Sequence, residues 1–258
     1  GGMTTLEVAI KDLAAKGGGL TVLQKAKLTM AQEPYVRIVR KQQRTGSDRG
    51  IYISDQPTRA KLQVIEGAAA AIADLIEEEV ISVRGDGKLI KMQRLIDKGL
   101  RWASGVSDFA HDGKAIRMKR RLMTVSLDCT KWSPGDNKMK FKIMIAAMTT
   151  VPKSVRNAMI ECLDAMHDIH LGLSTDQLAQ IDALADSATS RKLKEFFGMP
   201  EQATGLIQGN WLQGNLNSLS SLCGTACMNL AGEGARELMG FEVFHSAIAH
   251  SDDAYILI

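Results

Sequence analysis

Apolar residues recur at helical spacing over several stretches of the chain, and each such stretch predicts an amphipathic helix. We expect these helices over 4–16, from Pro57 to about residue 76, over 88–102, after Asn137, after Pro152, over roughly 176–197 and after residue 217. The helix that Pro57 opens has one apolar stripe, formed by Leu62, Ile65, Ala69, Ile72 and Ile76. The methionine-rich stripes after Asn137 and Pro152 predict core packing and not a cofactor site.

Alternating apolar and polar residues predict strands in three places. Over 122–128 the apolar Met123, Val125 and Leu127 alternate with polar residues, so Asp128 is expected at a strand end, on the face opposite the core. Residues 35–40 and 50–53 predict a basic β-hairpin or loop. The two acids of Ser251-Asp252-Asp253 stand between apolar stretches and predict a terminal hairpin, whose first arm covers 241–250. The mixture indicates an α+β fold.

Composition limits the class of protein without naming a function. The chain has 258 residues, of which 45% are hydrophobic, enough for one large domain or two lobes. The net charge of +3 predicts no particular partner. Four cysteines show no disulfide framework, which favours reduced thiols and an intracellular setting. No apolar run approaches the ~20 residues that span a bilayer. The chain stops in mid-strand at Ile258, so we expect a piece of a longer protein.

Basic residues gather in two segments, and each cluster is equally consistent with a solvated face and with an anion-binding surface. The first cluster is Arg37, Arg40, Lys41, Arg44, Arg49, Arg59 and Lys61. The second cluster is Lys114, Arg117, Lys119, Arg120 and Arg121.

An acid at a strand end that faces two acids in a hairpin turn suits nucleotidyl transfer. That reaction uses two divalent cations about 3.5–4 Å apart. Hard cations such as Mg²⁺ bind carboxylate oxygens and substrate phosphates. Asp128, Asp252 and Asp253 have the required chemistry. Spacing alone does not bring them together, and the alternative for three such aspartates is a set of solvated turns.

Four segments together resemble a known family. Asp128-x-x-Lys131-Trp132-Ser133 resembles motif A of the RNA-dependent RNA polymerases of segmented negative-strand RNA viruses, the bunyavirus group. Gln213-Gly214-Asn215 resembles their motif B, and Ser251-Asp252-Asp253 their motif C. Lys41-x-Gln43-x5-Arg49-x-Ile51 resembles the basic motif F. The order F, A, B, C is that of the family. The longer strings at 131–137, 210–217 and 250–253 are most similar to hantavirus-type L proteins, and the similarity covers roughly residues 25–258.

The resemblance implies a role for each matching residue. Asp128, Asp252 and Asp253 would be the catalytic residues and would bind two Mg²⁺ or Mn²⁺ ions. The residues that would hold the triphosphate or RNA are Lys41, Arg44, Arg49 and Lys131. Gln213 and Asn215 carry amides of the kind that reads a ribose hydroxyl, and Gly214 gives their loop freedom to move. Trp132 and Trp211 are expected as buried anchors, with base stacking as the alternative.

The resemblance also implies an architecture, a right-hand polymerase fragment of the fingers and palm. Residues 1–115 would be the fingers-side region with motif F, and 116–258 the palm core with motifs A, B and C. A fingers insertion is expected at about 150–205. The antiparallel palm sheet would pack on helices, with motifs D and E and the thumb absent from this chain. Expected partners are RNA template and product, nucleoside triphosphates, the remainder of the polymerase chain and nucleoprotein-coated viral RNA. The expected location is the host cytoplasm or the virion, without a membrane span.

Three functions are open from the sequence. The first is RNA-directed RNA synthesis by two-metal nucleotidyl transfer. The second is a catalytically incomplete RNA-binding remnant, which would bind RNA with strong salt dependence and without need of Asp128. The third is another palm enzyme, a reverse transcriptase or a nucleotidyl cyclase. The Gln213-Gly214-Asn215 loop disfavours the third, because those families lack it.

Overall fold

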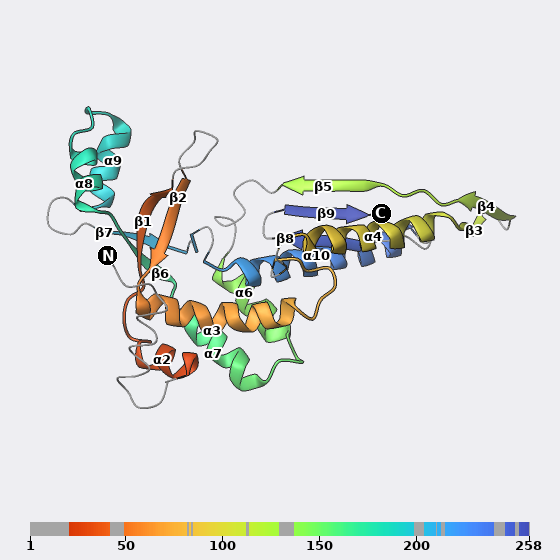
Figure 1. Ribbon diagram of the computed structural model, residues 1–258, viewed down its shortest axis with the longest axis horizontal. Coiled ribbons are helices and arrows are strands. Elements are labelled where there is room, and N and C mark those ends of the chain that lie inside the picture. The colour runs from red at the N-terminus through yellow and green to blue at the C-terminus, as the bar shows by residue number, and fades with distance from the viewer. Residues whose placement is uncertain are drawn as a thin grey trace. The chain divides into compact units, whose positions relative to one another are not determined.

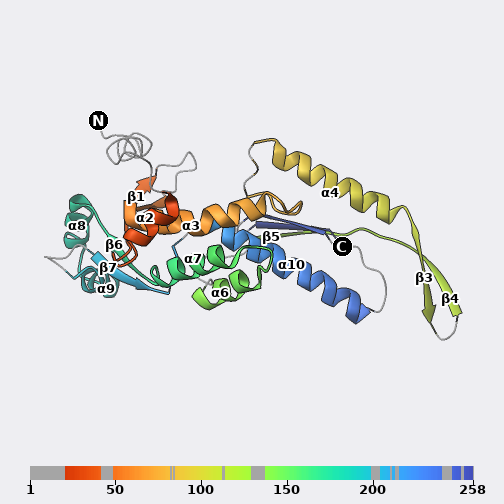
Figure 2. The same cartoon turned by 90° about the horizontal axis from the view of Figure 1, so that it is seen from below.

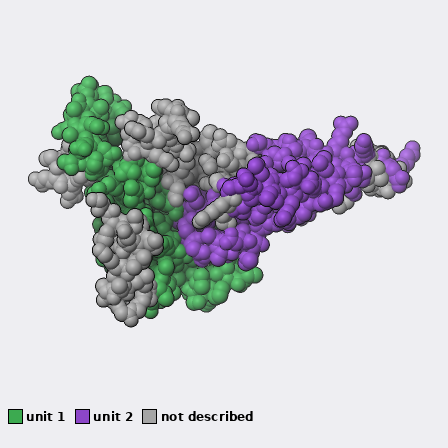
Figure 3. All heavy atoms as spheres, viewed as in Figure 1, with its two compact units in different colours: residues 1–65, 137–215 green, residues 66–136, 216–258 purple. Residues whose placement is uncertain are grey.

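The computed structural model describes residues 21–41, 49–81, 83, 85–111, 114–128, 137–198, 204–209, 211–212, 215–239, 246–250 and 253–257, in some strands as backbone alone. The predicted helix over 4–16 lies outside these residues. Helices and small sheets alternate along the chain, which confirms a mixed α+β fold (Figure 1). The chain divides into two compact units, residues 1–65 with 137–215 and residues 66–136 with 216–258 (Figure 3). The assignment of fingers and palm regions stays a prediction.

The first unit contains a four-stranded sheet in the order β2-β1-β6-β7. Its strands are β1 (Tyr35–Lys41), β2 (Arg49–Ser54), β6 (Asp168–Gly172) and β7 (Thr204–Gln208). β1 pairs antiparallel with β2 and parallel with β6, and β6 pairs antiparallel with β7. The predicted basic hairpin is therefore confirmed, whereas β6 and β7 were not predicted from the sequence. A buried cluster supports the sheet, formed by Val36, Ile169, Leu171, Phe197 and Leu212.

The first unit also contains several helices. They are α2 (Val22–Leu28), α6 (Lys138–Ala147), α7 (Lys153–Asp164), α8 (Thr175–Asp182), α9 (Ala188–Phe196) and the first part of α3 (Gln56–Ala73). α6 begins where the Asn137 side chain accepts the backbone N–H of Lys140 at 2.8 Å. The predicted stripes are buried at Phe141, Ile145, Met159 and Leu163, half-buried at Met144 and exposed at Val155. The methionine-rich stripes thus form part of the core, as predicted.

The single helix expected over 176–197 is wrong. The segment forms two helices, α8 and α9, because two serines each begin a helix of their own. Ser174 accepts the N–H of Gln177 at 3.3 Å, and Ser187 accepts the N–H of Ser190 at 3.1 Å. In both helices the third residue returns a bond to the capping backbone, which completes a capping box.

The second unit contains a three-stranded antiparallel sheet in the order β5-β9-β8. Its strands are β5 (Thr124–Asp128), β8 (Ser246–His250) and β9 (Asp253–Leu257). The terminal hairpin is confirmed, with 241–245 of its expected first arm outside the described residues. The strand expected over 122–128 begins at Thr124, and Met123 is 62% exposed. A separate hairpin, β3 (Val106–His111) with β4 (Lys114–Lys119), was not predicted (Figure 2).

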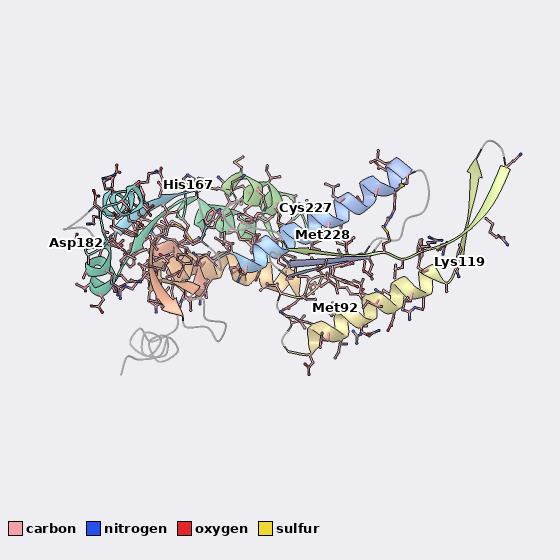
Figure 4. The ribbon with its side chains drawn as sticks, turned by 90° about the horizontal axis from the view of Figure 1, so that it is seen from above. Met92, Lys119, His167, Asp182, Cys227 and Met228 are labelled. Atoms are coloured by element: carbon pink, nitrogen blue, oxygen red, sulfur yellow. The ribbon has the colours of Figure 1, made fainter. Side chains whose placement is uncertain are left out.

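Two long helices pack on β8, namely α4 (Gly87–Ala103) and α10 (Asn217–Met239) (Figure 1). Both follow the predicted ranges closely. Val80, Leu95 of α4, Ile248 of β8 and Leu257 of β9 form a buried core between α4 and the sheet. Cys227, labelled on α10 in Figure 4, is exposed, whereas Cys223 one turn earlier is buried.

α3 joins the two units in sequence and matches its predicted stripe in part. Leu62, Ile65 and Ala69 are buried, whereas Ile72 is half-buried and Ile76 lies beyond the end of the helix. Asp55 caps the helix, because its Oδ1 accepts the N–H of Thr58 at 2.9 Å.

Candidate active site

The pairing of β5 with β9 brings two of the candidate acids together. In the antiparallel register Asp128 stands opposite Asp253, the last of five residue pairs. Opposed residues in such a ladder have Cα atoms about 4.5–5.5 Å apart. Asp128 ends β5 and Asp253 begins β9, so both lie at the same end of the sheet. The spacing of the motifs in the sequence did not determine whether Asp128 and Asp253 are neighbours, and the backbone register shows that they are. Asp252 lies outside the described residues, and the catalytic role of the three acids stays a prediction.

The β1–β2 hairpin places two candidate triphosphate ligands opposite each other in the same way. Its last residue pair is Lys41 with Arg49. Like charges in directly opposed positions destabilise a sheet. An anion bound at this end of the hairpin would relieve that repulsion, as a triphosphate would. Arg44 and Lys131 lie outside the described residues.

The loop after β7 is anchored in the core of the first unit. Trp211 is 3% exposed, and its ring meets that of Phe141 edge to face, with centroids 6.1 Å apart. This confirms the expectation that Trp211 is a buried anchor, while Trp132 lies outside the described residues. Leu212 is also buried and packs in the same cluster as Val36 of β1. The basic hairpin and this loop therefore share one apolar core.

The backbone of this loop is strained at Leu212. Its φ is 57°, in the left-handed region that a bulky side chain rarely adopts. Such a conformation costs on the order of 1–3 kcal/mol and persists only where packing holds it. Gly209 has a φ of 66°, which glycine adopts without that cost. The loop thus leaves β7 through an unstrained glycine and turns again at a residue held by the core.

Asn215 closes the loop. It is buried, its side-chain Nδ2 donates to the carbonyl of Trp211 at 2.9 Å, and its N–H donates to the carbonyl of Leu212 at 3.2 Å. The amide therefore has a fastening role within the first unit. Its expected contact with a ribose stays a prediction, and Gln213 and Gly214 lie outside the described residues.

Two glutamates that the motifs do not include hold α10 in the second unit. The first is Glu66 on α3. Its Oε2 accepts the N–H of Ser218 at 2.8 Å, and its Oε1 accepts the N–H of Leu219 at 3.1 Å. Burial raises the pKa of Glu66, and these hydrogen bonds oppose part of that rise. The sequence did indicate that α10 needs an acceptor from elsewhere in the chain, because Leu216 precedes the helix and has no side-chain oxygen to cap it.

The second glutamate is Glu79, which is fully buried in the segment between α3 and α4. Ser221 donates its hydroxyl to Oε1 at 2.7 Å, and Thr225 donates to Oε2 at 3.1 Å. The N–H groups of Val80 and Ile81 also donate to Oε1, at 2.9 and 3.0 Å. The run Glu77-Glu78-Glu79 reads as a solvated charge cluster, so sequence reasoning missed this residue.

The described side chains include no group of three or more His, Cys, Asp or Glu placed to hold a metal ion. The candidate ligands still have suitable chemistry, since the register joins two carboxylate-bearing residues at one end of a sheet. Carboxylate oxygens are the donors that Mg²⁺ and Mn²⁺ prefer. Among the described helices, none is long and apolar enough to cross a membrane.

Comparison with known proteins gives a consistent set of relatives. A family model described as bunyavirus RNA dependent RNA polymerase matches residues 3–258. RNA-directed RNA polymerase L of Dobrava-Belgrade orthohantavirus is 40% identical, over 98% of this chain and 12% of the relative. The Andes orthohantavirus protein of the same name is 38% identical over the same shares. That of European mountain ash ringspot-associated virus is 29% identical, over 85% of this chain and 9% of the relative. The chain spans about 12% of the length of the hantavirus relatives.

Proposed function

The chain belongs to the bunyavirus RNA-dependent RNA polymerase family, and we propose that it is the catalytic part of a viral RNA-directed RNA polymerase. The polymerase joins nucleoside triphosphates to a growing RNA on an RNA template. In this proposal the second unit carries the palm sheet, and the basic hairpin of the first unit belongs to the fingers. RNA template, RNA product and nucleoside triphosphates are the partners, together with the remainder of the polymerase chain and nucleoprotein-coated viral RNA. The host cytoplasm and the virion are the proposed locations.

The observation that carries the proposal is the register of β5 with β9. It sets Asp128 directly opposite Asp253, although the two residues come from separate motifs. Carboxylates directly opposed across two strands repel each other without a cation. A polymerase needs cations where the attacking hydroxyl meets the triphosphate, so this unfavourable pair has a functional explanation.

Asp128, Asp252 and Asp253 are the residues that would hold two Mg²⁺ or Mn²⁺ ions. When bound, these ions would supply positive charge for the attacking hydroxyl and for the leaving oxygens. Lys41, Arg44, Arg49 and Lys131 would bind the triphosphate and neutralise the charge that moves onto pyrophosphate. The amides of Gln213 and Asn215 would hydrogen-bond the ribose, which separates RNA from DNA synthesis.

The test uses the full-length polymerase that contains this chain. Asp128→Asn, Asp252→Asn and Asp253→Asn should each lower template-dependent incorporation by at least about 100-fold, since the loss of metal-held charge costs several kcal/mol. Asp176→Asn is the matched control, because Asp176 is an exposed carboxylate on α8, and it should keep the parent rate. Incorporation that persists in Asp128→Asn and Asp253→Asn at the parent rate would refute the assignment.

The same preparations decide between this function and the alternatives. The relatives named above are RNA-directed RNA polymerases, which favours RNA synthesis over reverse transcription or cyclisation. A full-length protein that binds RNA in a salt-dependent way, without incorporation and without any effect of Asp128→Ala, would instead be an RNA-binding remnant. Preference for deoxyribonucleotides, or a cyclic product, would identify another palm enzyme.

A further inference from the structure

The first turn of α10 is capped from a distance. A helix leaves its first backbone N–H groups without partners, and a polar side chain just before the helix usually accepts them. Leu216 occupies that place and has no oxygen to offer. The Glu66 carboxylate supplies both acceptors instead, one to Ser218 at 2.8 Å and one to Leu219 at 3.1 Å. Its negative charge also suits the positive end of the helix dipole.

This cap lies next in sequence to the loop of motif B. α10 begins at Asn217, and only Leu216 stands between it and Asn215. Asn215 is itself fixed on its other side by its bond to the Trp211 carbonyl. A shift in the first turn of α10 therefore passes to Asn215 through a single residue, which has little freedom to absorb it because Leu216 is buried.

We propose that Glu66 is a positioning residue for nucleotide selection, which acts through the first turn of α10 on the position of Asn215. The inference rests on the proposed function, where the Asn215 amide reads the ribose. Glu66 itself makes no contact with the nucleotide in this scheme. Glu66 holds the first turn of α10 in place, and this turn determines the position of Asn215, the last residue of the motif B loop.

Glu79 provides a matched control that acts on the same helix. It is also a glutamate that stabilises α10, but it does so at Ser221 and Thr225, beyond the first turn. A variant of Glu79 should loosen the helix without removing its cap. The two glutamates therefore separate an effect on loop position from an effect on helix stability.

The experiment compares ribonucleotide and 2′-deoxyribonucleotide incorporation by the full-length polymerase. In Glu66→Ala the ratio of the two kcat/KM values should fall roughly tenfold, mainly through a higher KM for the ribonucleotide, because misplacement by about 1 Å can cost up to 100-fold. Glu66→Gln keeps one acceptor oxygen and should show a smaller fall. Glu79→Gln should leave the ratio at the parent value. Hydrogen exchange of residues 218–222 should be faster in Glu66→Ala.

Each outcome has a defined meaning. An unchanged ratio in Glu66→Ala, with faster exchange at the start of α10, overturns the proposal. An equal fall in Glu66→Ala and Glu79→Gln overturns it too, because the cause would then be general loosening of the helix. If Glu66→Ala does not fold, Glu66→Gln carries the same comparison. A parent polymerase that incorporates no ribonucleotide overturns the proposed function itself, and this failure is visible before any variant is made.

Discussion

Replacing Glu79 with alanine should destabilise the second unit strongly, because this side chain is fully buried and accepts four hydrogen bonds. The donors are the Ser221 and Thr225 hydroxyls and the N–H groups of Val80 and Ile81, at distances between 2.7 and 3.1 Å. Alanine offers no acceptor to any of them.

The magnitude follows from those bonds. A hydrogen bond contributes about 0.5–1.5 kcal/mol net, so four bonds give roughly 2–6 kcal/mol. The two hydroxyls can turn to carbonyls of their own helix, which recovers part of the loss. Ile81 is only half-buried, so its N–H can reach water. We therefore expect Glu79→Ala to lower the free energy of unfolding by about 2–4 kcal/mol.

Urea unfolding of the 258-residue chain measures this change, and hydrogen exchange of α10 locates it. Glu79→Gln keeps one carbonyl oxygen and should lose about 1 kcal/mol. Glu78→Ala is the control, since Glu78 makes no hydrogen bond to the residues that the structure describes, and it should change stability by less than about 0.5 kcal/mol. A loss in Glu79→Ala no larger than that of Glu78→Ala would refute the argument.

Four further predictions concern the first unit and α3. Burial raises the pKa of Cys162 from 9.0 to about 11, so the folded thiol keeps a proton that the unfolded chain has lost. The free energy of unfolding should therefore be unaffected by this thiol below pH 9 and should fall between pH 9 and pH 11, by about 2–3 kcal/mol. Urea unfolding at several pH values measures this fall, and Cys162→Ala should lack it. Asp164 pairs with Lys142 at 2.7 Å and is 44% exposed; Asp164→Asn should cost about 0.5–1 kcal/mol at low salt and less at 1 M salt in the same assay. Gly67 lies inside α3, where an added Cβ meets nothing within 4 Å, so Gly67→Ala should raise the unfolding free energy by about 0.5–1 kcal/mol. Gly205→Ala should lower it by about 1–3 kcal/mol, because its Cβ would overlap the Phe196 ring; thermal unfolding that ranks these two variants in the opposite order would contradict the packing described here.

The elements that the sequence predicted well are those that local information determines. α4 and α10 have periodic apolar positions over many residues, and the terminal hairpin has a polar turn between apolar arms. β7 was missed because its residues, Thr204-Gly205-Leu206-Ile207-Gln208, show no alternation, and β6, which pairs with it, was missed although its apolar and polar residues do alternate. The break between α8 and α9 depended on Ser187, whose capping role competes with the helical spacing around it.

The candidate site shows the same division. The acids and bases were proposed from residue type and order, because motifs are local strings. The two glutamates that hold α10 were not found, because their partners lie far along the chain. Glu66 accepts the N–H groups of Ser218 and Leu219, and the residues around position 66 contain no pattern that predicts this contact. The register of Asp128 with Asp253 is equally long-range and needed the structure.

Residues of like charge stand opposite each other in two segments of expected function. Asp128 opposes Asp253 in one sheet, and Lys41 opposes Arg49 in another. Each pair of like charges costs stability when no ligand is bound, by about as much as a favourable cross-strand pair contributes, roughly 0.2–1 kcal/mol. One pair is complementary to cations and the other to a polyphosphate, the two components that nucleotidyl transfer brings together. The strained backbone of Leu212 adds a third cost in the loop that leads to Asn215. Proteins keep such conflicts where function requires them, so each of these features independently supports the expected role of its own segment.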